Sequence, residues 1–258
     1  MHSPSLTIQG KHEPFELQVA RGHIEGHKTL FKFGSNPDIN GSLETVWSQG
    51  GIYSYPAAAI QMKVSSSSTD DAALGTGART VFIYGLDANY NEITEVVTLN
   101  GQTEVLTVNS YLRVSRAYVV TAGSGETAAG TIYVGTGVVT AGVPATVYAV
   151  ITLGENQTTM AVWTVPAKHT LYVHRGFFSA ASSNTTHTIL GKFLIRTVGG
   201  VFRNAADITV TSGAVPYDFE IPLAIPEKTD IEARATALSG SNFYVTAAFE
   251  GIYIEVNP

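Results

Sequence analysis

Apolar and polar residues alternate in short segments along most of this chain. Between Thr229 and Thr236, apolar residues occupy every second position and charged residues lie between them. Successive side chains of a β-strand point to opposite faces, so this pattern predicts a strand with one buried face. The stretch from Phe243 to Phe249 repeats the alternation, which indicates that strands dominate the end of the chain.

Further segments, rich in Val, Ile, Thr and Tyr and bounded by Gly, Asn, Asp or Ser, are expected to be strands as well. The expected strands cover residues 80–86, 93–99, 104–108, 112–120, 131–134, 159–165, 170–178, 189–198, 208–211, 218–223, 230–237 and 243–256. Asn100-Gly101 is a strong hairpin signal, because both residues tolerate a positive φ. The close spacing of these segments is typical of β-sandwiches and barrels, and no long helix is indicated.

The sequence therefore predicts an all-β protein in three parts. An extended N-terminal arm is expected over residues 1–40, a first β-sandwich over residues 41–140, and a second, jelly-roll-like sandwich over residues 141–258. The glycine-rich stretch from Gly135 to Pro144 is interpreted as the junction between the two sandwiches, with a long interstrand loop as the alternative.

The expected arm has no clear strand pattern before Leu30 but is too apolar to remain in water. It either lies on a neighbouring molecule or adds an edge strand to its own domain. Aromatic residues are frequent anchors of protein interfaces, because they bury a large area. The expected interface anchors are Phe15, Phe31 and Phe33 in the arm, with Trp47 and Tyr53 near its end.

Composition narrows the classes of function. The 258 residues include no cysteine, which excludes disulfides and cysteine-based metal or thiol chemistry. The net charge of −6, with only 15 Lys and Arg, argues against a nucleic-acid partner. No apolar run is long enough to predict a membrane span, and the first residues do not resemble a secretory signal.

No motif for catalysis or for cofactor binding is present. His23 and His27 have the spacing of two metal ligands on a helix, but Gly22 and Gly26 disfavour a helix there and no third ligand follows. Nucleophile elbows, phosphate-binding loops and dinucleotide fingerprints are absent. We therefore expect a protein without a cofactor, a bound metal or enzymatic activity.

Several runs of sequence resemble virion structural proteins of marine tailed bacteriophages, cyanophages especially. Residues 33–38 (FGSNPD) and 41–51 (GSLETVWSQGG) carry the first part of this resemblance. The run over residues 75–101 is similar to the most recognisable block of that group, and the similarity continues in residues 109–118, 156–166 and 227–236. The resemblance spans nearly the whole chain and implies a component of a virus particle, located in the virion after assembly in the host cytoplasm.

Three functions fit this resemblance. The favoured one is a non-enzymatic capsid decoration or cement protein, which would form a homo-oligomer, preferably a trimer, and brace the subunits of a major capsid protein. The alternative is a tail or neck component, such as a fibre, an adaptor or a host-binding module near the baseplate. A polysaccharide depolymerase is the least favoured, because such enzymes need sequence repeats that this chain lacks.

Overall fold

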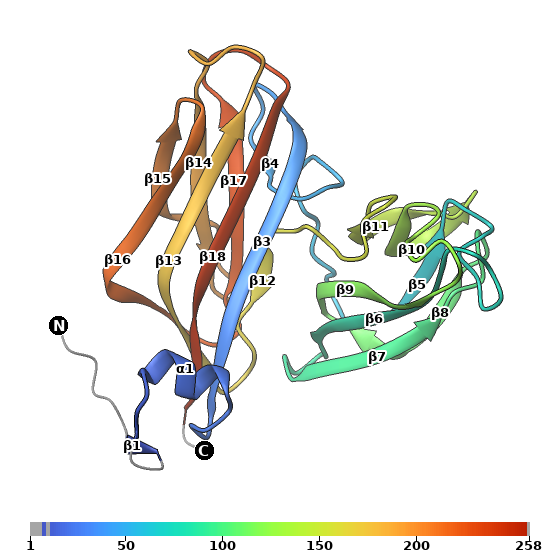
Figure 1. Cartoon of the computed structure of the whole chain (residues 1–258), viewed down its shortest axis with the longest axis horizontal. Helices are drawn as coiled ribbons and strands as arrows, with labels where there is room; N and C mark the ends of the chain where they lie inside the picture. The colour runs from blue at the N-terminus through green and yellow to red at the C-terminus, as the bar shows by residue number, and fades with distance from the viewer. Residues whose placement is uncertain (1–6, 9–10, 257–258) are drawn as a thin grey trace.

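The chain forms two lobes that are built almost entirely from β-strands (Figure 1). The computed structural model describes the backbone of residues 7–8 and 11–256, and the side chains of residues 13–256. We call residues 13–46 and 161–256 the large lobe and residues 47–160 the small lobe. One short helix, α1 (Phe15–Ala20), precedes the first long strand. The prediction of an all-β protein is confirmed.

The large lobe contains two facing sheets. One sheet has the strand order β16-β13-β18-β3, and the other has the order β12-β17-β14-β15, with the short β4 also paired to β17. Their bounds are β3 (His27–Ile39), β4 (Glu44–Thr45), β12 (Val162–Thr164), β13 (His169–Ala181), β14 (Ile189–Arg196), β15 (Arg203–Val210), β16 (Gly213–Ile225), β17 (Asp230–Ala237) and β18 (Phe243–Glu255).

The strand pairs of the large lobe are nested within one another. The first long strand β3 pairs with the last strand β18, β12 pairs with β17, β13 with β16, and β14 with β15, all antiparallel. The eight strands therefore behave as one long hairpin whose two arms have been wound together into two sheets. The fully buried Phe178, Phe193, Phe243 and Phe249 lie in the core between these sheets.

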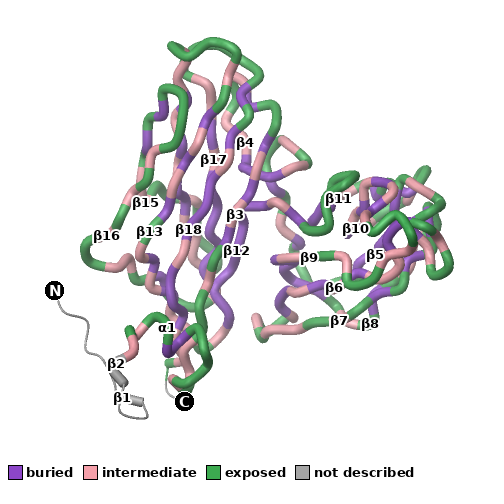
Figure 2. Tube along the Cα trace, in the orientation of Figure 1, coloured by how far each residue is buried: buried purple, intermediate pink, exposed green. Residues whose placement is uncertain are grey.

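The small lobe also consists of two antiparallel sheets. Their orders are β11-β10-β5-β8 and β7-β6-β9. The bounds are β5 (Ile60–Ser66), β6 (Ala78–Leu86), β7 (Glu92–Thr98), β8 (Val105–Tyr111), β9 (Arg113–Ala122), β10 (Ile132–Thr140) and β11 (Val143–Ile151). Both sheets contribute to one core, in which Met62, Ile83, Tyr111 and Ile132 are fully buried. Figure 2 shows buried segments along the strands of the small lobe, β5 and β6 among them.

The chain leaves the large lobe for the small lobe and returns from it at a single point. Ala161 N–H donates to Val46 O (2.9 Å), and both segments also bond to Ala233 of β17. Gly34 of β3 lies directly against this crossing, since a Cβ there would be 2.2 Å from Ala161 N and 2.3 Å from Val46 O. A side chain at residue 34 would push the two connections off the sheet, so the crossing requires glycine.

These pairings correct the predicted division of the chain. Of the two arrangements expected for the N-terminal part, residues 27–39 adopt the second, because β3 pairs with β18 from His27 to Ile39 as an edge strand of its own domain. The predicted boundary between residues 140 and 141 falls inside the hairpin of β10 and β11. The pairing of β3 with β18 joins segments far apart in the sequence, whereas the hairpin of β10 and β11 is local and was missed because its glycine-rich sequence reads as a loop.

A short helix and two short strands precede β3. Helix α1 packs near β3 and buries Val19, while Phe15 contacts the ring of His27 at 5.9 Å. Two short strands, β1 (Thr7–Ile8) and β2 (Lys11–His12), pair with each other. The part of the predicted arm at residues 1–6 and 9–10 lies outside the described residues. Among the described residues, no helix has the length and apolar character that crossing a membrane requires.

Candidate functional site

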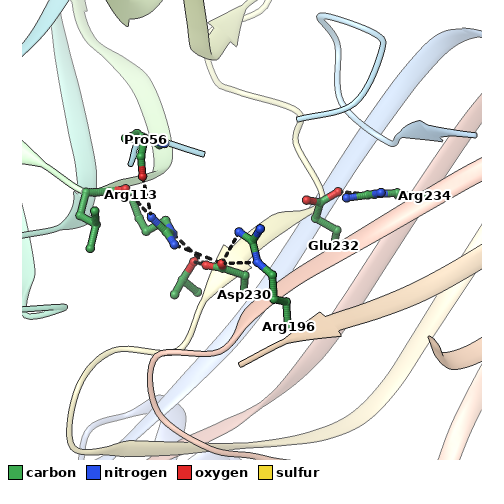
Figure 3. A network of polar contacts seen from close by, with 8 residues as sticks. Pro56, Arg113, Arg196, Asp230, Glu232 and Arg234 are labelled. Carbon is green, nitrogen blue, oxygen red and sulfur yellow. Dashed lines mark hydrogen bonds and ion pairs between the residues drawn. The ribbon is translucent and has the colours of Figure 1, made fainter. Parts of the chain in front are cut away.

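A buried ionic network joins the two lobes. Asp230 of β17 in the large lobe binds Arg113 of β9 in the small lobe, with Arg113 Nε 2.8 Å from Oδ1 and Nη2 3.1 Å from Oδ2 (Figure 3). Arg196 of β14 donates to the same Oδ2 from Nη2 at 2.6 Å, and Thr164 donates its hydroxyl proton to Oδ1. One carboxylate thus holds two guanidinium groups, and only 5% of its side chain is exposed.

Aromatic rings and the connecting segment complete the network. Arg113 Nη1 donates to Pro56 O in the connection to the small lobe. The ring of Tyr55 contacts both guanidinium groups, with its centroid 4.8 Å from that of Arg113 and 4.4 Å from that of Arg196. Because both Coulombic and cation–π contacts cross the boundary in a nearly dry site, the network fixes how the small lobe is oriented.

A second carboxylate lies beside this network on the same strand. Glu232 is fully buried, and its Oε2 accepts hydrogen bonds from Thr45 Oγ1 (2.9 Å) and Arg234 Nε (2.6 Å). Figure 3 shows Arg234 and Glu232 next to the Asp230 cluster. Thr45 belongs to β4, immediately before the chain leaves for the small lobe, so this ion pair anchors the exit point.

The fixed orientation leaves a cleft of about 460 Å³ between the lobes. One wall is β3, where Phe31 and Phe33 lie side by side with ring centroids 5.8 Å apart. The other wall is the outer face of β6 and β9, where Phe82 stacks on Tyr118 at 4.8 Å. A volume of several hundred Å³ at a domain boundary, lined by aromatic rings, is typical of small-molecule sites.

Lys32 lies in the cleft lining between the two phenylalanines but points inward, because alternate residues of a strand face opposite sides. It is only 2% exposed, and its Nζ donates to Ser115 O of β9. Burial, and then the nearby Arg116, lower the pKa of Lys32 well below its usual value. Among the described residues, no carboxylate forms an ion pair with Lys32 or with Arg116.

Near the cleft, two lining tyrosines bind one carboxylate. Tyr84 and Tyr253 both donate their hydroxyl protons to Glu92 Oε1, at 2.6 and 3.0 Å. Lys28 pairs with the other oxygen of Glu92. Burial acts in the opposite direction, but hydrogen bonds from Lys28 and Tyr84 lower the pKa of Glu92. This carboxylate is therefore neutralised by its own partners, and the cleft keeps a positive character.

The structure brings only part of the predicted anchors together. Phe31 (52% exposed) and Phe33 lie in the cleft wall, whereas Phe15 packs beside Tyr172 and Ile252 on the outer face of the large-lobe sheet. Trp47 and Tyr53 are 4% and 3% exposed and belong to the core of the small lobe, with ring centroids 5.0 Å apart. Those two residues are therefore core residues with little surface for a partner.

Sequence reasoning missed the charged residues of the site. The sequence around Lys32 gives only a weak indication of its role. On β3 this lysine faces inward and its two aromatic neighbours face outward, the reverse of the usual alternation of apolar and polar residues. Arg113 and Asp230 are 117 positions apart and give no local signal of their pairing. Among the described residues, no group of three or more His, Asp or Glu side chains could hold a metal ion.

Comparisons with known proteins identify no family. A scan of protein-family models gave no match, and a search of curated proteins gave none either. Among solved structures, the crystal structure of the infectious bursal disease virus VP2 subviral particle is similar with a TM-score of 0.26 and 12% identity, over 90% of this chain and 72% of that chain. The structure of infectious bursal virus derived T=1 particles is similar with a TM-score of 0.27 and 13% identity, over 90% of this chain and 70% of that chain. TM-scores of this size describe a distant likeness and establish neither a shared fold nor a function.

Proposed function

We propose that this chain is a non-enzymatic structural protein of a virus particle, and that it decorates or cements a capsid. The supporting observation is the nested pairing of the large lobe, β3 with β18, β12 with β17, β13 with β16 and β14 with β15. Eight antiparallel strands wound in this way form a jelly roll, an architecture found in viral capsid proteins as well as in lectins and cupins. Among these three classes of protein, the resemblance of the sequence to phage virion proteins favours a protein of a virus particle.

The inserted small lobe suits a bracing role. It is joined to the large lobe through two connections that cross at one point and through the buried Arg113–Asp230 pair. A lobe held in this way transmits force instead of swinging freely, which a protein that links neighbouring capsid subunits needs.

The small lobe also offers a surface for a neighbouring subunit. Leu106 and Val108 on β8 and Val138 on β10 are 54%, 87% and 74% exposed. These residues belong to one sheet, in which β5 lies between β8 and β10, and exposed apolar side chains on one sheet are a common mark of protein contact. We propose that this surface contacts either the major capsid protein or other copies in a homo-oligomer, with a trimer favoured.

The number of copies per particle tests the proposed role. Quantitative gel densitometry of purified particles should show hundreds of copies for a decoration protein. A few dozen copies or fewer would instead support the alternative, a tail or neck component.

The contact surface is tested by substitution of the most exposed residue. Val108→Asp should abolish binding of the purified protein to virus particles from which this protein is missing. The fold should stay intact, because the side chain of residue 108 is 87% exposed in the isolated chain. Val201→Asp, at a residue that is 75% exposed in the large lobe, is the matched control and should bind normally. Normal binding by Val108→Asp would exclude this surface.

A further inference from the structure

We propose that the cleft between the lobes binds an acidic sugar, with the sugar ring on the aromatic walls and its carboxylate on Lys32 and Arg116. The site holds whether or not the chain is part of a virus particle, because it rests on the chemistry of the cleft alone.

The charge of the cleft selects an anion. Lys32 and Arg116 both line it, and none of its twelve lining residues is acidic. Burial of an ammonium group without a carboxylate costs free energy, because one carbonyl oxygen does not replace the water that the group loses. Lys32 lines the cleft with a side chain that is 2% exposed, and Ser115 O is its one hydrogen-bond partner among the described residues, so two of its three N–H groups have no protein partner.

Arg116 is positioned to act with Lys32. Its Nη2 donates to Phe31 O at 2.9 Å across the cleft, which ties the guanidinium group to the opposite wall and leaves its other N–H groups available. The two cations come from different lobes, and both line the same cavity. Together they match one carboxylate.

The aromatic walls select a flat, partly apolar ligand. Phe31 and Phe33 line one side, and the stacked Phe82 and Tyr118 line the other. The face of an aromatic ring is negative and attracts the polarised C–H groups on the face of a sugar ring. A free phosphate fits less well, because it has no apolar face to place on these aromatic rings.

The ligand class is tested by calorimetric titration of the full chain with two matched probes. Tetragalacturonate should bind, and the same tetrasaccharide with its carboxyl groups methyl-esterified should bind at least about tenfold more weakly, the ratio that about 1.4 kcal/mol produces. Inorganic phosphate should not compete with the tetrasaccharide. Failure of tetragalacturonate to bind at about 10 mM, equal binding of the ester, or displacement by phosphate would each overturn the proposal.

Variants locate the binding to the cleft. Lys32→Met, which keeps the length of the side chain, and Phe31→Ala, at a half-exposed residue, should each weaken tetragalacturonate at least about fivefold. The controls are Lys63→Met and Tyr244→Ala, a lysine and an exposed tyrosine outside the cleft, which should bind as the unaltered protein does. Unchanged binding by both cleft variants would refute the site.

One measurement needs no substitution and covers the case of a variant that fails to fold. Trp163 belongs to the core of the large lobe (3% exposed) but also lines the cleft, whereas the other tryptophan of the chain, Trp47, lies in the core of the small lobe and does not line it. Tetragalacturonate should therefore shift the tryptophan emission of the unaltered protein in a saturable way, with the same midpoint as the calorimetric titration. Calorimetric binding without this shift would place the sugar elsewhere.

Discussion

Replacement of Asp230 by Asn tests whether the buried network holds the lobes. The substitution keeps the shape of the side chain but removes the charge that Arg113 and Arg196 share. Their side chains are 9% and 26% exposed, so neither cation regains full hydration in the folded protein. An amide also donates where a carboxylate accepts, and its N–H groups would face guanidinium N–H groups.

The cost follows from burial. Removal of the charge of one partner of a buried ion pair lowers the free energy of unfolding by about 3–5 kcal/mol, because the remaining charge stays in a poorly solvated site. Arg196 is partly exposed and contributes the smaller share, while Arg113 contributes the larger. For a chain of this size, the loss corresponds to a fall in Tm of roughly 6–20 °C.

Urea unfolding and calorimetry measure this loss, and small-angle scattering reports whether the lobes move apart before they unfold. The matched control is Asp218→Asn, whose ion pair with Arg175 is exposed to solvent on both sides and which should leave the stability nearly unchanged. If Asp230→Asn loses less than about 1 kcal/mol, or loses no more than the control, the network does not hold the lobes.

Three further outcomes follow from the structure. Gly34→Ala should destabilise the large lobe and shift its urea midpoint downward, since the new Cβ would overlap backbone atoms at the crossing; an unchanged midpoint would show that the connections can move aside. Lys32→Met should raise Tm by about 2–4 °C, because loss of a buried, unpaired ammonium is worth about 1 kcal/mol more than its one hydrogen bond, and a lower Tm would contradict this sign. Burial raises the pKa of six tyrosines, which are Tyr53, Tyr55, Tyr84, Tyr111, Tyr217 and Tyr253. The unfolded chain loses these phenolic protons near pH 10 while the folded chain keeps them, so stability should fall as pH rises above about 10, together with a cooperative rise in phenolate absorbance; independent titration of all twelve tyrosines near pH 10 without unfolding would count against it.

The sequence predicts the strands of the large lobe well where one face is buried. The segment 230–237 is recovered as β17, and the segment 189–198 is recovered as β14 with a shorter end. Alternation identifies such strands, because each has a core side and an outer side. It missed β11, which begins with Val143 and Pro144 in a glycine-rich stretch that reads as a loop.

Tertiary placement could not be predicted in the same way. Trp47 and Tyr53 looked like interface anchors, because large aromatic residues suit an interface and a core equally well. Which of the two applies is decided by the small lobe, whose strands close over them. The cleft likewise depends on the pairing of β3 with β18 and of Arg113 with Asp230, and these partners lie more than a hundred residues apart.

The pairing of β3 with β18 also sets the order of events during synthesis. Between Ile39 and Phe243 the ribosome must add 204 residues (243 minus 39) before the partner strand begins to emerge. At roughly 5–20 residues per second, β3 waits about 10–40 s without its neighbour, long enough for the small lobe to fold first. During that interval the unpaired strand, which carries Leu30, Phe31 and Phe33, is open to pairing with other chains. The nascent protein is therefore most vulnerable to aggregation at the same strand that later forms one wall of the cleft.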